Sequence, residues 1–159
     1  MKKLNISIPG LGNLNFKYLV LDLNGTLALD GKLLPGVTER LQKLNESFKK
    51  IYVITADTHG TATEVFKGLP VEIYKITSST ETAEKQAFVK ALGSDVCIAI
   101  GNGANDALML RESGLGICVL GKEAAALSTL LNADVVVQDI NDALDLLLFP
   151  KRLVATLRK

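Results

Sequence analysis

The chain of 159 residues lacks several features that would place it in a specialised class. No apolar run approaches the ~20 residues of a membrane-spanning helix, so no membrane partner is expected. Its 18 basic and 17 acidic residues leave a net charge of +1, which argues against a broad nucleic-acid-binding surface. The segment after Met1 is mixed rather than apolar, so we expect no signal peptide and a cytoplasmic location.

Cysteine is also scarce, which excludes chemistry that depends on it. Cys97 and Cys118 both lie inside apolar runs, so we expect buried free thiols rather than a disulfide framework or a zinc site.

What the sequence does contain is a regular alternation of strand-like and helix-like segments. Short apolar runs predict strands at Tyr18–Leu21, Ile51–Ile54, Val71–Ile76, Val96–Ile100, Leu115–Val119 and Val135–Val137. Amphipathic stretches predict helices at Val37–Phe48, Thr61–Phe66, Thr82–Leu92, Asp106–Glu112, Ala124–Leu131 and Asn141–Leu148. This alternation indicates an α/β fold, a three-layer doubly wound parallel sheet of Rossmann-like type.

The whole chain, 1–159, is expected to form one domain. Residues 1–17 alternate around a Pro-Gly turn and predict a β-hairpin, 18–149 form the core, and 150–159 follow as a tail. The hairpin packs either on its own domain or against another subunit. Thr38 and a capping box at Thr80 are expected to begin two helices, and Gly93 to end the second.

Polar side chains recur where the predicted strands end. Asp22 and Asn24 follow the first strand, Thr55 follows the second, and Gly101-Asn102-Gly103-Ala104-Asn105-Asp106 ends the fourth. Because the carboxyl ends of parallel strands gather at one edge, Asp22 and Asp106 are expected to face each other. Two close carboxylates repel unless a proton or a cation intervenes, and oxygen ligands suit Mg²⁺.

Two further groups are expected to support that edge. Lys85, near the start of a helix, could aim its ammonium at the carboxylates and at a bound phosphate. Gly25, Gly101 and Gly103 would let backbone amides approach an anion closely. Taken singly, each of these residues is more often a turn former, a cap or a surface group, but together they favour a site.

In this order the elements resemble the haloacid dehalogenase superfamily of aspartyl phosphotransferases. Asp22-Leu23-Asn24-Gly25-Thr26-Leu27 resembles its first motif, Asp-x-Asp-Gly-Thr, and 101–106 resembles its fourth, Gly-Asp-Gly-x-Asn-Asp. Thr55 and Lys85 stand where the second and third motifs are expected. Within the superfamily, the greatest likeness is to the P-type ATPase phosphorylation domain and to the small soluble P-type ATPase-like phosphatases. Thr55-Ala56-Asp57 resembles their Thr-Gly-Asp.

The resemblance implies a role for each matched residue. Asp22 would be the nucleophile that forms an aspartyl phosphate, and a phosphorylated substrate would be the partner. Thr55, Ala56, Lys85 and Asn105 would contact the phosphoryl group. Mg²⁺ would be held by Asp22, Asp106, Asn102 and the backbone carbonyl of Asn24. The implied activity is that of a phosphatase, with weak ATP or aryl phosphate hydrolysis.

The chain departs from the family pattern at two positions. Asn24 stands where phosphatases carry a general acid and base, and that loss typically costs ~10²–10⁴-fold in rate. Asn102 replaces a carboxylate, so Mg²⁺ should bind more weakly. The only histidine, His59, is more readily explained as an exposed helix-start residue than as a substitute acid.

The spacing also leaves no room for a cap domain. Only a loop, a helix and a strand fit between Asp22 and Thr55, and again between Thr55 and Lys85. Either the substrate is large or a second copy of the chain covers the site, which makes a homo-oligomer plausible.

Two other functions compete with a slow Mg²⁺-dependent phosphohydrolase. A non-catalytic phosphate-binding or regulatory module on the same fold would explain Asn24 and Asn102. A nucleotide-binding domain of the doubly wound type is disfavoured, because no Gly-x-Gly-x-x-Gly turn follows the first strand.

Overall fold

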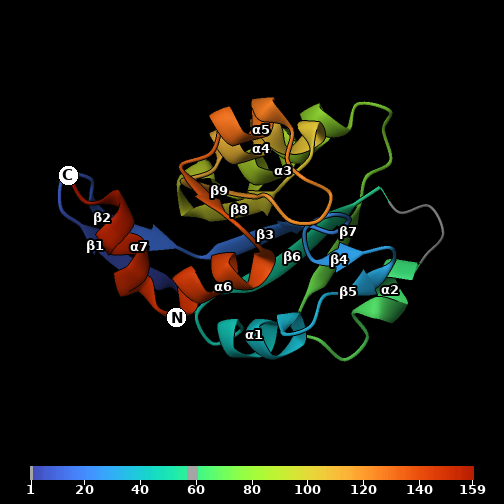
Figure 1. The fold of residues 1–159 in the computed structure, drawn as a ribbon, viewed down its shortest axis with the longest axis horizontal. Helices are drawn as coiled ribbons and strands as arrows, with labels where there is room; N and C mark the ends of the chain where they lie inside the picture. Colours follow the sequence, from blue (N-terminus) through green and yellow to red (C-terminus); the bar gives the residue numbers. More distant parts are fainter. Residues whose placement is uncertain (1, 57–60) are drawn as a thin grey trace.

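The computed structural model describes residues 2–56 and 61–159, and a parallel sheet forms its centre (Figure 1). The strand order is β10-β9-β8-β3-β6-β7. These strands are β3 (Tyr18–Asp22), β6 (Lys50–Thr55), β7 (Glu72–Lys75), β8 (Cys97–Gly101), β9 (Leu115–Val119) and β10 (Val135–Val137). Every pairing between them is parallel. The predicted α/β fold is confirmed, with each strand within one residue of its expected bounds.

Helices cover both faces of the sheet. One face carries α1 (Val37–Leu44) and α6 (Ile140–Leu148), and the other carries α3 (Glu81–Leu92), α4 (Ala107–Glu112) and α5 (Leu127–Leu131) (Figure 1). The remaining short elements are α2 (Thr61–Val65), the antiparallel pair β4 (Ala28–Leu29) and β5 (Lys32–Leu33), and the 3-10 turns η1 (Ser94–Val96) and η2 (Ala104–Asp106). Among the described residues, no helix is long and apolar enough to cross a membrane.

The pleat of β3 divides the core into two layers. Leu19 and Leu21 belong to the larger apolar cluster, which includes α1 and α6, whereas Val20 belongs to the cluster beneath α3 and α4. Cys97 and Cys118 lie in that second cluster, and both are buried free cysteines, as predicted. Burial raises the pKa of the Cys97 thiol to about 12, so it behaves as a small apolar side chain.

The N-terminal hairpin packs within its own chain. Strands β1 (Leu4–Ile8) and β2 (Gly12–Phe16) pair antiparallel, with Ile6 opposite Leu14. Its apolar face is buried, and helix α7 (Pro150–Leu157) packs beside β1 (Figure 1). The sequence reading treated 150–159 as a tail. Instead, Pro150 occupies the first helical turn, where its fixed φ is favourable.

Several helices begin or end at other residues than predicted, or lack the side-chain caps that were expected. Helix α1 ends at Leu44 rather than Phe48, and Gly36, with φ 89°, precedes it without a side-chain cap from Thr38. Thr80 makes no capping hydrogen bond either. The predicted helix from Ala124 begins only at Leu127, because Ala124 has a positive φ of 62°. Gly93 ends α3 as predicted.

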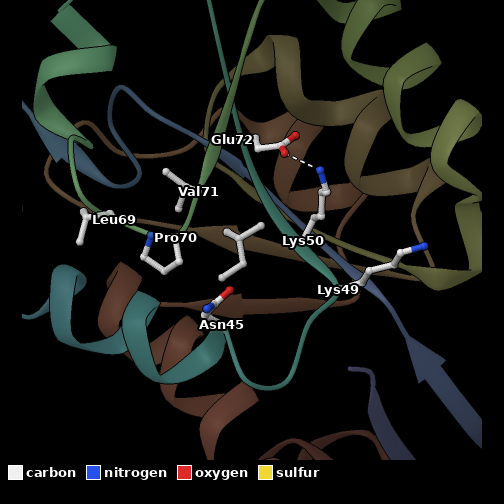
Figure 2. Close-up of a pocket in the computed structure, with 8 residues that line it drawn as sticks. Asn45, Lys49, Lys50, Leu69, Pro70, Val71 and Glu72 are labelled. Carbon is white, nitrogen blue, oxygen red and sulfur yellow. Dashed lines mark hydrogen bonds and ion pairs between the residues drawn. The ribbon is translucent and has the colours of Figure 1, made fainter. Parts of the chain in front are cut away.

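Different groups of residues lie at the amino ends and at the carboxyl ends of the parallel strands. At the amino ends of β6 and β7, a hollow of about 300 Å³ is bordered by Pro70 and by an ion pair between Lys50 and Glu72 (Figure 2). The motif residues instead gather at the carboxyl ends of the strands, where ligands bind in open α/β sheets.

The packing of α7 predicts a large stability difference between two identical truncations. Leu153 in α7 is 1% exposed, whereas Leu131 in α5 is 71% exposed. We expect Leu153→Ala to lower the free energy of unfolding by about 2–4 kcal/mol, through lost burial and a residual cavity. Leu131→Ala should change it by less than ~0.5 kcal/mol. Urea denaturation of both variants measures this, and equal effects would contradict the packing of α7 onto the hairpin.

Candidate active site

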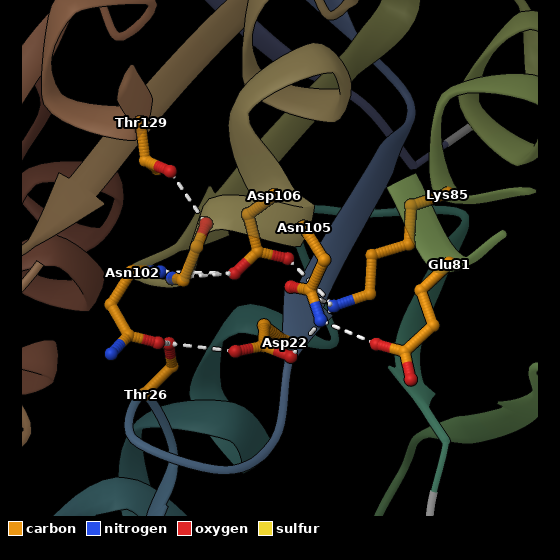
Figure 3. A network of polar contacts seen from close by, with 9 residues as sticks. Asp22, Thr26, Glu81, Lys85, Asn102, Asn105, Asp106 and Thr129 are labelled. Carbon is orange, nitrogen blue, oxygen red and sulfur yellow. Dashed lines mark hydrogen bonds and ion pairs between the residues drawn. The ribbon is translucent and has the colours of Figure 1, made fainter. Parts of the chain in front are cut away.

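The motif residues converge because their strands are neighbours in the sheet. Strand β3, which ends at Asp22, lies between β6 and β8, and Asp22 is in register with Ile54. Thr55 therefore ends the strand beside Asp22, and Asn102 follows the strand on its other side. As predicted, the side chains of Asp22, Asp106 and Lys85 meet at this edge (Figure 3).

Lys85 reaches from α3 and bridges the two carboxylates (Figure 3). Its Nζ donates to Asp22 Oδ1 at 3.0 Å, to Asp106 Oδ1 at 2.7 Å and to Asn105 Oδ1 at 3.1 Å. Because an ammonium has three protons, these acceptors use all of them. Only 2% of the Lys85 side chain is exposed, so this is a buried charge stabilised by its partners.

The carboxylate of Asp106 is held on its other side by the backbone. Asp106 Oδ2 accepts from the amides of Asn102, at 3.1 Å, and Gly103, at 3.0 Å. A Cβ on Gly101 would lie 2.5 Å from Asp106 Cγ, so this position requires glycine. Of the glycines expected to let amides approach a bound anion, Gly103 therefore gives its amide to the protein's own carboxylate, and the Gly25 amide donates to the Ala28 carbonyl.

The network perturbs the acidity of Asp22. Burial, and then repulsion from Asp106, raises the pKa of the Asp22 carboxyl to about 7 despite the opposing effect of Lys85. Burial alone would lower the pKa of Lys85, but the two carboxylates outweigh it and raise that pKa. The positive charge of Lys85 therefore offsets only part of the free-energy cost of ionising Asp22 in this buried position beside Asp106.

Thr26 lies between Asp22 and Asn102 (Figure 3). Its Oγ1 is 3.3 Å from Asp22 Oδ2 and 3.1 Å from Asn102 Oδ1, and it is a possible donor to both. Because the hydroxyl has one proton, it cannot serve both oxygens fully at once. The amide of Asn102 is fixed in this orientation, since its Nδ2 donates to the Ala124 carbonyl at 3.0 Å.

The sequence reading missed three supporting residues. Thr26 was part of the first motif but received no role. Glu81 accepts a hydrogen bond from Asn105 Nδ2, and its position four residues before Lys85 on one helix face was a usable signal. Thr129 Oγ1 donates to the Gly103 carbonyl from α5, and no local pattern pointed to that contact.

The other predicted residues lie around the same edge. Thr55 is 2% exposed and Ala56 is half-buried directly after it. Asn24 is exposed, in the loop that follows Asp22, and its side chain makes no hydrogen bond within the described part of the chain. Asp57 and His59, which were also considered, lie outside the described residues.

The donor set suits a hard divalent cation. Asp22 Oδ2, Asn102 Oδ1 and the backbone carbonyl of Asn24 are all oxygens, the ligand type that Mg²⁺ prefers. The single hydroxyl proton of Thr26 can bond fully to only one of Asp22 Oδ2 and Asn102 Oδ1 at a time. The other oxygen is then available to such an ion. Within 2–56 and 61–159, no three His, Cys, Asp or Glu side chains come together as a metal-binding group, so amide and carbonyl oxygens would have to complete such a site.

The chain is similar to known proteins both in sequence and in structure. Over 61 residues the chain is 62% identical to "Uncharacterized protein MJ0073" of Methanocaldococcus jannaschii. That alignment covers 38% of this chain and 66% of the relative, so the match spans just under two thirds of the relative's length.

Solved structures share the fold at low sequence identity. The 3-deoxy-D-manno-octulosonate 8-phosphate phosphatase of Moraxella catarrhalis, in complex with magnesium, phosphate and KDO, has a TM-score of 0.70 at 19% identity. The alignment covers 90% of this chain and 94% of that one. The catalytic domain of the CPx-ATPase CopB-B has a TM-score of 0.59 at 24% identity, covering 72% of this chain and 45% of that one.

The family comparison covers the first and fourth motifs together. The description "haloacid dehalogenase-like hydrolase" matches residues 9–114, a range that includes Asp22, Lys85 and Asp106. With the sheet order and the site geometry, this match shows that the chain belongs to the haloacid dehalogenase-like hydrolases.

Proposed function

We propose that this protein is a slow, Mg²⁺-dependent phosphohydrolase that works through an aspartyl phosphate on Asp22. One observation carries the proposal: a buried ammonium, Lys85, bridges Asp22 and Asp106 at the carboxyl edge of the sheet. Among the described residues, the other oxygen of Asp22, Oδ2, has only the Thr26 hydroxyl as a donor, at 3.3 Å, so this oxygen retains a lone pair for attack.

Asp22 is the nucleophile in this proposal. A carboxylate oxygen attacks phosphorus, the ester oxygen leaves, and an aspartyl phosphate forms that water later hydrolyses. Lys85 favours the ionised form of Asp22 and orients it, and Asp106 and Asn105 fix Lys85. Thr55, which ends β6 beside Asp22, and Ala56, which follows it, would contact the phosphoryl oxygens.

Asp22, Asn102 and the Asn24 carbonyl would hold Mg²⁺, which supplies charge stabilisation for the transferring phosphoryl group. Asp106 was also expected to bind the ion. Lys85 and two backbone amides use three of the roughly four lone-pair sites of this carboxylate, so we assign it chiefly to positioning Lys85.

The slow rate follows from Asn24. Its side chain is exposed, so it can meet a substrate, but an amide transfers no proton to the leaving oxygen or from the attacking water. The aspartyl phosphate should therefore persist longer than in family members with an aspartate at this position.

A phosphate-binding module without turnover is the second candidate, and Asn24 together with Asn102 favours it. Incubation with beryllium fluoride distinguishes the two, because a stable adduct on Asp22 requires a competent nucleophile and metal site. The phosphatases of the same fold act on phosphorylated substrates, which supports that substrate class here. A homo-oligomer that covers the open site stays a prediction.

Replacement of Asp22 tests the nucleophile. With Mg²⁺ and an aryl phosphate, Asp22→Asn should lower turnover at least ~10³-fold, because no other group accepts the phosphoryl group. Asp95→Asn, which alters an exposed acid at the opposite sheet edge, should leave turnover unchanged. Equal rates for wild type and Asp22→Asn would rule out the mechanism.

Restoration of the acid tests Asn24. Asn24→Asp should raise turnover by ~10-fold or more, because it supplies the missing proton transfer. Asn15→Asp, the same substitution at an exposed hairpin position, serves as the control. Steady-state kinetics and the lifetime of the phosphoenzyme measure the effect, and an unchanged rate for Asn24→Asp would mean that proton transfer does not limit the reaction.

The raised pKa of Asp22 predicts a pH-dependent stability penalty. The pKa is about 7 in the fold and 3.8 in the reference state, so the folded state binds a proton that the unfolded state releases. Stability is therefore lost as the pH rises from 4 to 7. With metal ions chelated, the stabilisation by Asp22→Asn relative to wild type should grow by about 2–3 kcal/mol between pH 5 and 8. Denaturant unfolding at each pH measures it, and a difference independent of pH would contradict the shift.

A further inference from the structure

The first-motif loop packs against an acidic side chain that belongs to no motif. Gly25 has a φ of 79°, and a Cβ at this position would lie 2.7 Å from Asn102 Nδ2 and 3.1 Å from the carboxyl carbon of Glu123. The Asn102 amide and the Glu123 carboxyl therefore lie beside the same point of the loop that carries Asn24. A side chain at position 25 would crowd both groups.

The loop that carries Glu123, residues 120–126, is fixed to the active site at several points. The Ala124 carbonyl accepts from Asn102 Nδ2 at 3.0 Å, and the Ala126 amide donates to the Asn102 carbonyl at 2.9 Å. At its other end, the Leu120 amide donates to the carbonyl of Val137, the last residue of β10, and the Gly121 amide donates to the next carbonyl, that of Gln138. The positive φ of 62° at Ala124 is a strained conformation that these contacts maintain.

The charge of the site makes this neighbour significant. Asp22, Asp106 and Lys85 together carry one net negative charge, and Asn102 adds none, although a divalent cation is better balanced by two. Glu123 is exposed and takes part in no ion pair with any residue that the structure describes. Its carboxylate is therefore free to face a cation beside Asn102 and the Asn24 carbonyl.

We infer that Glu123 supplies the carboxylate that the fourth motif lacks at Asn102 and binds the divalent cation, directly or through a coordinated water. The inference rests on the proposed function, because it assumes a cation at Asp22 and Asn102. It assigns a binding role to the 120–126 loop, and it explains how a site with an amide at 102 retains a second negative charge.

Direct measurement of cation binding tests this role without reference to turnover. Mn²⁺ binding followed by electron paramagnetic resonance, and Mg²⁺ binding by calorimetry, give dissociation constants for wild type and Glu123→Gln. Glu123→Gln should weaken both by about tenfold or more, because one full charge beside the ion is removed. Glu39→Gln, an exposed acid on α1, is the matched control and should bind as wild type does.

A second variant separates charge from loop structure. Asn102→Asp places the carboxylate in the motif itself, so Asn102→Asp/Glu123→Gln should bind the cation at least as tightly as wild type. Failure of this rescue, or a dissociation constant for Glu123→Gln within twofold of wild type, would overturn the role of Glu123. A fall in turnover with unchanged cation affinity would also overturn it and would assign Glu123 to proton transfer.

The outcomes also separate this inference from the proposed function. If wild type binds Mn²⁺ but Glu123→Gln binds it equally well, only the role of Glu123 fails. If wild type itself binds neither ion up to millimolar concentration, the Mg²⁺-dependent function fails together with the inference.

Discussion

The active-site edge depends on one buried interaction, the bridge from the Lys85 ammonium to Asp22 and Asp106. Two carboxylates that have lost water would repel each other, and the ammonium between them makes the arrangement stable. The bridge also joins three separate parts of the chain, namely β3, α3 and the turn after β8. Fixing one nitrogen atom thereby fixes the relative positions of the first, third and fourth motifs.

The partners of each carboxylate then determine its role. Asp106 receives Lys85 on one oxygen and two backbone amides on the other, so its capacity is used within the protein. Asp22 shares Lys85 but has only Thr26 near its second oxygen, and its pKa is raised to about 7. The carboxylate of Asp106 is thus fixed by three hydrogen-bond donors, whereas the ionised form of Asp22 is only partly stabilised by its partners.

The second oxygen of Asp22 lies near Thr26 and Asn102, on the side of the site where the chain departs from the motif pattern of its family. Asn24 and Asn102 both replace carboxylates there, and Glu123 lies beside them from the 120–126 loop. Membership in the haloacid dehalogenase-like hydrolases supports the roles proposed for Asp22 and Lys85. In the proposed mechanism, the balance between forming and hydrolysing the phosphoenzyme depends on Asn24, Asn102 and Glu123.

The sequence by itself determined the parallel sheet, both buried cysteines, and the convergence of Asp22, Lys85 and Asp106. Short uninterrupted apolar runs are typical of strands buried on both faces, and parallel strands bring their carboxyl ends to one edge, so local patterns were sufficient for these. The sequence did not reveal α7, the contacts of Thr129, or the approach of Glu123 to Gly25. Each of these depends on which side chains meet across the folded chain, and it was only tertiary packing that brought residues 25, 102 and 123 to one point.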